Sequence, residues 1–261
     1  MRDQGGWLAA QPQGADGIER FASRVVELLA SRGPGDGQAL RTDLAQRLID
    51  AVVLGSAEAL DECLAEFRRQ RVTVAALADT YVPEAARQMG QRWVDDTMTF
   101  ADVSMAATRL QALLRGIGGS WSADAGRARD GGAILLAVPE GEQHTLGPMI
   151  VMGRLRRMGV SVCMRLAPVA EELRALMQAR AFDGAFVSVS ARNHLAAARV
   201  VTDSIRSASE TRLTVIVGGP VLALTGDARD ATGADLATSD LTEALSACSL
   251  FPTSESQRKT A

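Results

Sequence analysis

The residues best suited to chemistry in this 261-residue chain surround one of its two histidines. His144 belongs to the segment Glu140-Gly-Glu-Gln-His-Thr-Leu-Gly147, which follows a continuous apolar run. Glu142 stands two residues before it, where its carboxylate can accept an N–H of the imidazole ring. Such a bond selects one tautomer and leaves the other ring nitrogen free to bind a metal. Gly147 lets a bulky ligand approach the backbone closely. The spacing therefore predicts a metal-binding imidazole at His144.

The other candidate metal ligands lack such a setting. His194 opens a predicted helix after the third strand, and we interpret it as a surface or helix-cap residue. The cysteines Cys63, Cys163 and Cys248 are far apart, and no pair has the spacing of a metal-ligand set. We therefore expect free thiols in a protein of the reducing cytoplasm.

The second half of the chain must position His144, and it alternates short apolar runs with amphipathic segments. Strands that are apolar on both faces and alternate with helices indicate a doubly wound parallel sheet. Ligands of such α/β sheets bind at the carboxyl ends of the strands, where the His144 loop lies. Strands are predicted at 133–138, 160–166, 184–190 and 213–217, with helices through Arg157 and at 171–180, 195–207 and 242–247.

Residues 38–118 instead repeat apolar side chains at helical spacing, which is typical of a bundle of four or five helices. Gly55 is expected to end one helix and Thr73 to cap another, which Pro83 bends or restarts. The predicted buried faces are Leu40, Leu44, Leu48 and Val52; Leu60, Leu64 and Phe67; Val74, Leu77, Val82, Ala85 and Met89; and Val103, Ala107, Leu110, Leu114 and Ile117.

We expect the domain boundaries to follow this change of hydrophobic period. The small, polar stretch 122–132 reads as an interdomain linker. The predicted parts are a disordered N-terminus at 1–16, a helical bundle at 17–121 whose first helix spans 17–31, a Rossmann-like domain at 133–250, and a flexible tail at 251–261.

Composition excludes several classes of function. The formal net charge is -3 and no Lys/Arg block occurs, so the charge footprint of a strong nucleic-acid binder is absent, and direct DNA contact stays open. No signal peptide and no apolar run of about 18 residues is present, so we expect a cytoplasmic protein without a membrane span. No nucleophile–base pair, phosphate loop or two-carboxylate site stands out, and we expect no enzyme activity.

The segment Glu142-x-His144-x-x-Gly147 resembles the acid-x-His-x-x-Gly motif of cobalamin-binding Rossmann-like domains. Two further motifs of that family have counterparts here, in the family's order and spacing. Ser188-Val189-Ser190 stands where the family has Ser-x-Leu, and Gly218-Gly219 follows the fourth strand. Taken alone, the serines also fit an alternating strand and the glycines an ordinary turn.

This resemblance implies that His144 is the lower ligand of cobalt in a bound cobalamin, adenosylcobalamin or hydroxocobalamin. In the family, the nucleotide base leaves the cobalt and enters a channel in the sheet, which requires small side chains. Ser188, Ser190, Gly218 and Gly219 would line that channel. The hydroxyl of Ser188 would bond to a nitrogen of the base. Ser190 in place of leucine departs from the family and loosens the packing expected around the base.

The bundle is the second part of the resemblance. Cobalamin-binding proteins of the methionine synthase and light-sensing regulator kinds place a helical bundle just before the sheet domain. Residues 91–95 and 100–103 resemble its ligand-facing region, in which Trp93 would stack over the upper axial group. Ordinary core packing of Trp93 is the alternative. The light-sensing regulators carry a Glu-His pair after this tryptophan, and Asp102-Val103-Ser104 stands here instead, which leaves the upper ligand open.

Over its whole length the chain resembles the aerobic repressor family of purple phototrophic bacteria, AerR or PpaA. The likeness is carried by the Glu140–Gly147 segment and by the region 93–114. It implies a cobalamin-binding antirepressor that responds to light or oxygen and contacts a DNA-binding repressor of photosystem genes of the CrtJ or PpsR type. Two alternatives stay open, a corrinoid carrier of a methyltransferase system and a haem-binding redox sensor, because imidazole suits both metals.

Overall fold

A computed structural model describes residues 40–123, 132–209 and 211–250. The chain divides into two compact units, Met1–Ser120 and Trp121–Ala261. The predicted N-terminal segment, the helix at 17–31 and the C-terminal tail lie outside the described residues. Within the described part, no helix is both long and apolar enough to cross a membrane.

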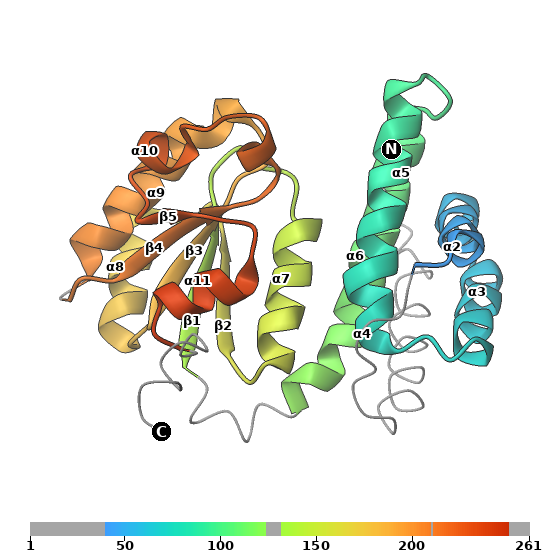
Figure 1. Cartoon of the computed structure of the whole chain (residues 1–261), viewed down its shortest axis with the longest axis horizontal. Coiled ribbons are helices and arrows are strands. Elements are labelled where there is room, and N and C mark those ends of the chain that lie inside the picture. Colours follow the sequence, from blue (N-terminus) through green and yellow to red (C-terminus); the bar gives the residue numbers. More distant parts are fainter. Residues whose placement is uncertain (1–39, 124–131, 210, 251–261) are drawn as a thin grey trace, which may run out of the picture. The chain divides into compact units, whose positions relative to one another are not determined.

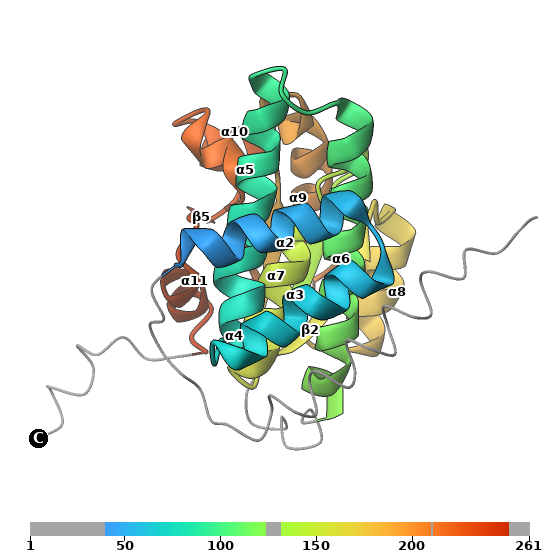
Figure 2. The ribbon, with the colours of Figure 1, turned by 90° about the vertical axis from the view of Figure 1, so that its right-hand side faces the viewer.

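The first unit is built from amphipathic helices, each of which buries one face. Figure 2 shows α2 and α3 side by side. Most of the predicted apolar faces are buried, including Leu44, Leu64 and Leu110. Leu40 is an exception because it precedes the first described helix and is exposed. The elements are α2 (Thr42–Leu54), α3 (Ala57–Arg69), α4 (Val74–Ala76), the π-helical turn η1 (Leu77–Tyr81), α5 (Val82–Val94) and α6 (Phe100–Ala123).

Local sequence explains where these helices begin and end. Gly55 ends α2 with a left-handed φ of 75°, which glycine adopts without steric cost. The Thr73 side chain accepts the N–H of Ala76 at 3.0 Å, and this confirms the predicted cap. As predicted, the α-helix restarts at Pro83, because α5 begins at Val82 and carries this proline in its first turn. A π-turn precedes it, in which the N–H of Val82 reaches back to the carbonyl of Leu77.

Side chains distant in sequence tie the helices together. Phe67 and Tyr81 pack edge to face, with ring centroids 4.8 Å apart. Arg109 of α6 donates to the carbonyl of Val52 at 2.6 Å, at the C-terminal end of α2. The guanidinium therefore satisfies a carbonyl that has no partner within its own helix.

The second unit is a five-stranded parallel sheet with the order β2-β1-β3-β4-β5 (Figure 1). Four of the strands were predicted from their apolar runs, whereas β5 has only two residues and shows no readable period. The helical N-terminal region followed by this sheet confirms the predicted fold class. The strands are β1 (Ala133–Val138), β2 (Ser161–Leu166), β3 (Gly184–Ser188), β4 (Thr214–Gly218) and β5 (Leu236–Ala237).

Helices cover both faces of the sheet because successive strand side chains point to opposite sides. Ile134 and Leu136 of β1 pack in one core cluster with residues of α7 and α11, whereas Leu135 and Ala137 pack in another with α8, α9 and α10. Figure 1 shows the same two layers. The helices are α7 (Leu146–Arg157), α8 (Ala170–Ala179), α9 (Leu195–Ala208), α10 (Ala228–Thr232) and α11 (Leu241–Ala247).

The strand order places the predicted motifs side by side. β1 lies between β2 and β3, and the helices that follow β1 and β3, α7 and α9, cover opposite faces. Both connecting loops begin at the carboxyl edge of two neighbouring strands, which is where ligands bind in doubly wound folds. The loop that carries His144 and the loop after β3 therefore meet at this edge.

Candidate functional site

Glu142 is the centre of the site at the carboxyl edge of the sheet. Its side chain is only 1% exposed although it carries a carboxylate. Oxygen Oε1 accepts the backbone N–H of His144 at 2.8 Å and lies 2.8 Å from Nδ1 of the same residue. Oxygen Oε2 accepts the backbone N–H of Ser190 at 2.7 Å. The carboxylate thus joins the loop after β1 to the loop after β3.

These hydrogen bonds keep Glu142 ionised. Burial alone would raise the pKa of Glu142, because a charge is less stable away from water. The Ser190 hydroxyl, the backbone N–H groups of His144 and Ser190 and the His144 ring together outweigh burial and lower this pKa to about 2. A negative charge is therefore present at neutral pH, directly beside the imidazole that the sequence singled out.

His144 presents its second ring nitrogen outward. Its side chain is 75% exposed, whereas its Nδ1 is engaged by Glu142. The oxygen of Ser190 also lies 3.0 Å from Nδ1. When Nδ1 donates its proton to the carboxylate, Nε2 keeps a free lone pair and can bind a metal. This is the arrangement that the Glu-x-His spacing predicts.

His194 does not have the surface or cap role predicted for it. Its side chain makes no capping bond at the start of α9 and is only 17% exposed. Its Nδ1 lies 3.0 Å from Oε2 of Glu142. One buried carboxylate therefore contacts two imidazoles. The signal that could have revealed this contact is the position of His194 just after the strand that pairs with β1.

A cavity of about 230 Å³ lies beside His144 at the same edge of the sheet. Apolar side chains make up much of its wall. It is lined by Leu136, His144, Gly147, Pro148, Val151, Phe186, Val187, Ser188, Ser190, Ile216, Gly218, Gly219, Pro220, Thr238, Ser239, Asp240, Leu241 and Ala244. Six of the seven residues predicted in this unit line the cavity directly. The seventh, Glu142, contacts the His144 ring beside it. Sequence reasoning missed Thr238 to Asp240, because they follow the unpredicted strand β5.

Different physical reasons explain why glycine stands at each of these positions in the predicted motifs. A Cβ added at Gly147 would meet nothing within 4 Å, so this glycine leaves open space beside His144. Gly219 has a φ of 110°, and an added Cβ would lie 2.4 Å from the carbonyl oxygen of Val189. An added Cβ at Gly218 would lie 2.9 Å from the carbonyl oxygen of Thr238. The Gly-Gly pair is therefore required by the fold, while Gly147 is not.

Trp93 belongs to the first unit, whereas the other predicted site residues belong to the second. Its side chain is 48% exposed, so the alternative of ordinary core packing is wrong. Its ring contacts Phe100, with centroids 5.9 Å apart, and Phe100 is exposed as well. Stacking of Trp93 over a cofactor stays a prediction.

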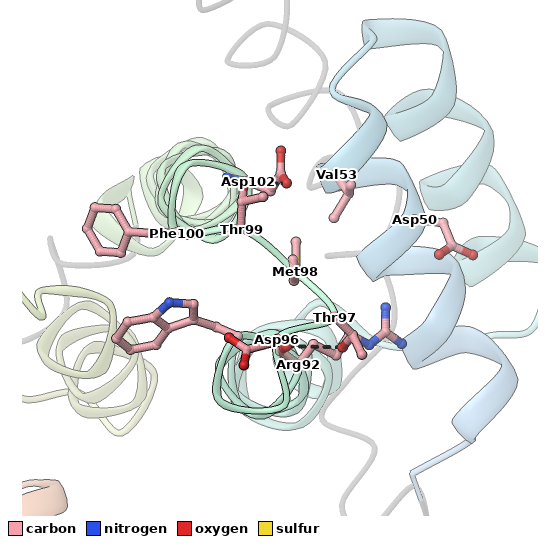
Figure 3. Close-up of a pocket in the computed structure, with 10 residues that line it drawn as sticks. Asp50, Val53, Arg92, Asp96, Thr97, Met98, Thr99, Phe100 and Asp102 are labelled. Atoms are coloured by element: carbon pink, nitrogen blue, oxygen red, sulfur yellow. Dashed lines mark hydrogen bonds between the residues drawn. The ribbon is translucent and has the colours of Figure 1, made fainter.

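A hollow of about 550 Å³ lies next to Trp93 between α2, α5 and the start of α6. Figure 3 shows Asp50 and Val53 of α2 across this hollow from Thr99 and Asp102, with Arg92 of α5 at its side. Its lining combines charges of both signs with the exposed aromatic pair of Trp93 and Phe100.

One relative of the chain is the 20.5 kDa protein of the bchF-crtJ intergenic region of Rhodobacter capsulatus. The two are 39% identical over 191 residues, which make up 73% of this chain and 100% of that protein. The chain belongs to the family of this protein. No protein-family model matches the chain.

The fold has a counterpart among solved structures. The monomethylamine corrinoid protein of Methanosarcina barkeri matches 80% of this chain and 97% of its own, with a TM-score of 0.59 and 16% identity. At this identity the likeness is one of fold alone. The methanol:cobalamin methyltransferase complex MtaBC of the same organism matches 91% of this chain and 88% of its own at 18% identity, but its TM-score of 0.42 is too low for an argument.

Proposed function

We propose that the chain is a cobalamin-binding antirepressor that responds to light or oxygen and acts on a DNA-binding repressor of the CrtJ/PpsR type. The observation that carries the proposal is the His144 ring, which a buried carboxylate orients and which keeps an exposed nitrogen beside a cavity. The regulatory part is supported by the relative's place in the bchF-crtJ intergenic region, next to a gene of the repressor type that the resemblance implies.

The residues at the sheet edge fit the cofactor. His144 would bind cobalt through Nε2, and Gly147 leaves space free next to it. The cavity extends along the face of the sheet that α7 and α11 cover, past Leu136, Phe186 and Ile216, where a flat aromatic base of the nucleotide would be surrounded by apolar groups. The Ser188 hydroxyl would bond to the base nitrogen, which would otherwise be buried without a partner. A corrinoid protein with the same fold supports this assignment.

The protein's own residues orient and tune the site. Bound adenosylcobalamin would supply a cobalt–carbon bond that light can break. Glu142 holds His144 in the Nδ1–H tautomer, and its charge makes Nε2 a stronger donor. The parallel sheet is a rigid support for both loops.

A corrinoid carrier of a methyltransferase system is the second candidate. The fold likeness to the monomethylamine corrinoid protein favours it. A carrier would accept a methyl group on reduced cobalt from a partner enzyme and would not bind the repressor. The haem-binding alternative has no such support, and a Soret band in the purified protein would reveal it.

Illumination tests the regulatory proposal. The full chain is loaded with adenosylcobalamin in the dark, and its absorbance spectrum and affinity for a CrtJ/PpsR-type repressor are measured before and after light. We expect both to change in the wild type. In His144→Ala, freed of unbound cofactor, we expect no light-dependent change in repressor affinity. An unchanged spectrum with unchanged repressor binding would contradict a light switch. Methyl transfer to cobalt without repressor binding would favour the carrier.

A further inference from the structure

His194 makes a contact that the proposed ligand set does not use. Its Nδ1 reaches Oε2 of Glu142 from the loop after β3. The ring lies near the turn that precedes His144, since a Cβ added at Gly141 would lie 3.9 Å from His194 Nε2. Its side chain is only 17% exposed, so the contact with the carboxylate is largely shielded from water.

The two imidazoles contact different oxygens of the same carboxylate. Oε1 lies 2.8 Å from Nδ1 of His144, and Oε2 lies 3.0 Å from Nδ1 of His194. Each donor to an ionised carboxylate stabilises its charge and lowers its basicity. The basicity of that carboxylate in turn decides how strongly it enhances electron donation from the metal-binding nitrogen of His144. A second imidazole on Glu142 therefore weakens the effect of the carboxylate on the first.

We infer that His194 shares the charge of Glu142 and so limits electron donation from His144 to a bound metal. The inference rests on the proposed function, because it takes His144 as the cobalt ligand. The backbone N–H groups of His144 and Ser190 hold the carboxylate at 2.8 and 2.7 Å without His194. Loss of the His194 donor thus removes the charge sharing and leaves Glu142 in place. His194 acts through Glu142 and is a positioning residue.

Two substitutions separate charge sharing from packing. His194→Phe keeps a flat ring and removes the N–H donor, whereas His194→Asn keeps an amide N–H near the place of Nδ1. The full-length variants are loaded with hydroxocobalamin, and the midpoint potential of the cobalt(III)/cobalt(II) couple is measured. We expect a more negative potential in His194→Phe, because stronger donation stabilises the higher oxidation state. His194→Asn should stay near the wild-type potential.

The possible outcomes are distinct. An unchanged or more positive potential in His194→Phe would overturn the inference, and so would equal shifts in the two variants, which indicate packing alone. If the wild type takes up no cobalamin, the proposed function fails instead. The inference is then tested in the cofactor-free chain by ¹⁵N NMR. A stronger bond to Glu142 should move the His144 Nδ1 resonance downfield in His194→Phe but not in His194→Asn, and identical resonances would overturn it.

Discussion

At the scale of single residues, Gly147 and Gly219 predict opposite results for the same substitution. Gly147→Ala should leave the free energy of unfolding unchanged or raise it by up to about 1 kcal/mol, because alanine favours the helix and its Cβ meets nothing. The same methyl group should weaken cobalamin binding, since it occupies the space expected for the ligand. Urea unfolding of the cofactor-free chain and a cobalamin titration measure the two effects separately.

Gly219→Ala is the matched control. Its φ of 110° and the 2.4 Å approach of a Cβ to Val189 O should cost more than about 1 kcal/mol of stability, with or without cofactor. If Gly147→Ala bound cobalamin like the wild type, the open space would have no role in cofactor binding. If Gly147→Ala unfolded as easily as Gly219→Ala, the space around Gly147 would not be open as described.

The Glu142–His144 contact could be predicted from the sequence because the two residues are two positions apart in one loop. The contact of His194 with Glu142 spans 52 residues and exists only because β3 pairs with β1. Composition and local spacing carry no information on that pairing. The exposure of Trp93 could not be predicted from helical periodicity either. Periodicity places a residue on one face of a helix and does not say what covers that face.

At the scale of elements, Asp235 fastens the short strand β5 to the sheet. Its carboxylate accepts the N–H of Val215 at 2.8 Å and lies 3.1 Å from Arg206 and 3.3 Å from Arg212. Burial would raise the pKa of Asp235, but the Val215 N–H and the two guanidinium groups hold it below the usual value of 3.8. The residues after β5 line the cavity, so this fastening also shapes the site.

Asp235→Asn should therefore lower the free energy of unfolding by about 1–3 kcal/mol near neutral pH. Because the folded pKa is lowered, the stabilisation is complete above the unfolded value and is lost as pH falls below about 3.8. The difference between wild type and variant should shrink in that acid range, as measured by urea unfolding at several pH values.

Asp203→Asn provides the control, because Asp203 pairs with Arg199 on an exposed helix surface. Its loss should change stability by no more than about 0.5 kcal/mol. A difference between wild type and Asp235→Asn that is independent of pH would show that the carboxylate charge is not what fastens β5.

At the scale of the whole molecule, Trp93 tests whether the helical unit takes part in cofactor binding. Trp93→Ala should change the stability of the cofactor-free chain little, since the ring is about half-exposed and contacts Phe100. It should weaken cobalamin binding and alter the spectrum of the loaded protein, if the ring stacks on the upper face. Met105→Ala, an exposed apolar residue of the same unit, is the control. Equal cobalamin affinity in Trp93→Ala and wild type would leave the sheet unit as the whole binding site.

The fold class could be predicted because the change from helical spacing to continuous apolar runs extends over many residues in each unit. Short elements could not be predicted, since β5 and α10 have too few residues to show a period. The helix α6 continues to Ala123 and so includes the first two residues of the predicted linker.

The central claim is that His144 binds cobalt, and a hydroxocobalamin titration of His144→Ala against the wild type tests it most directly. In the wild type we expect tight uptake and an absorbance shift that marks an imidazole ligand. In His144→Ala the shift should be absent and the affinity lower, while the circular dichroism spectrum stays unchanged because the ring is exposed. Equal uptake with an identical absorbance shift in both proteins would contradict the account.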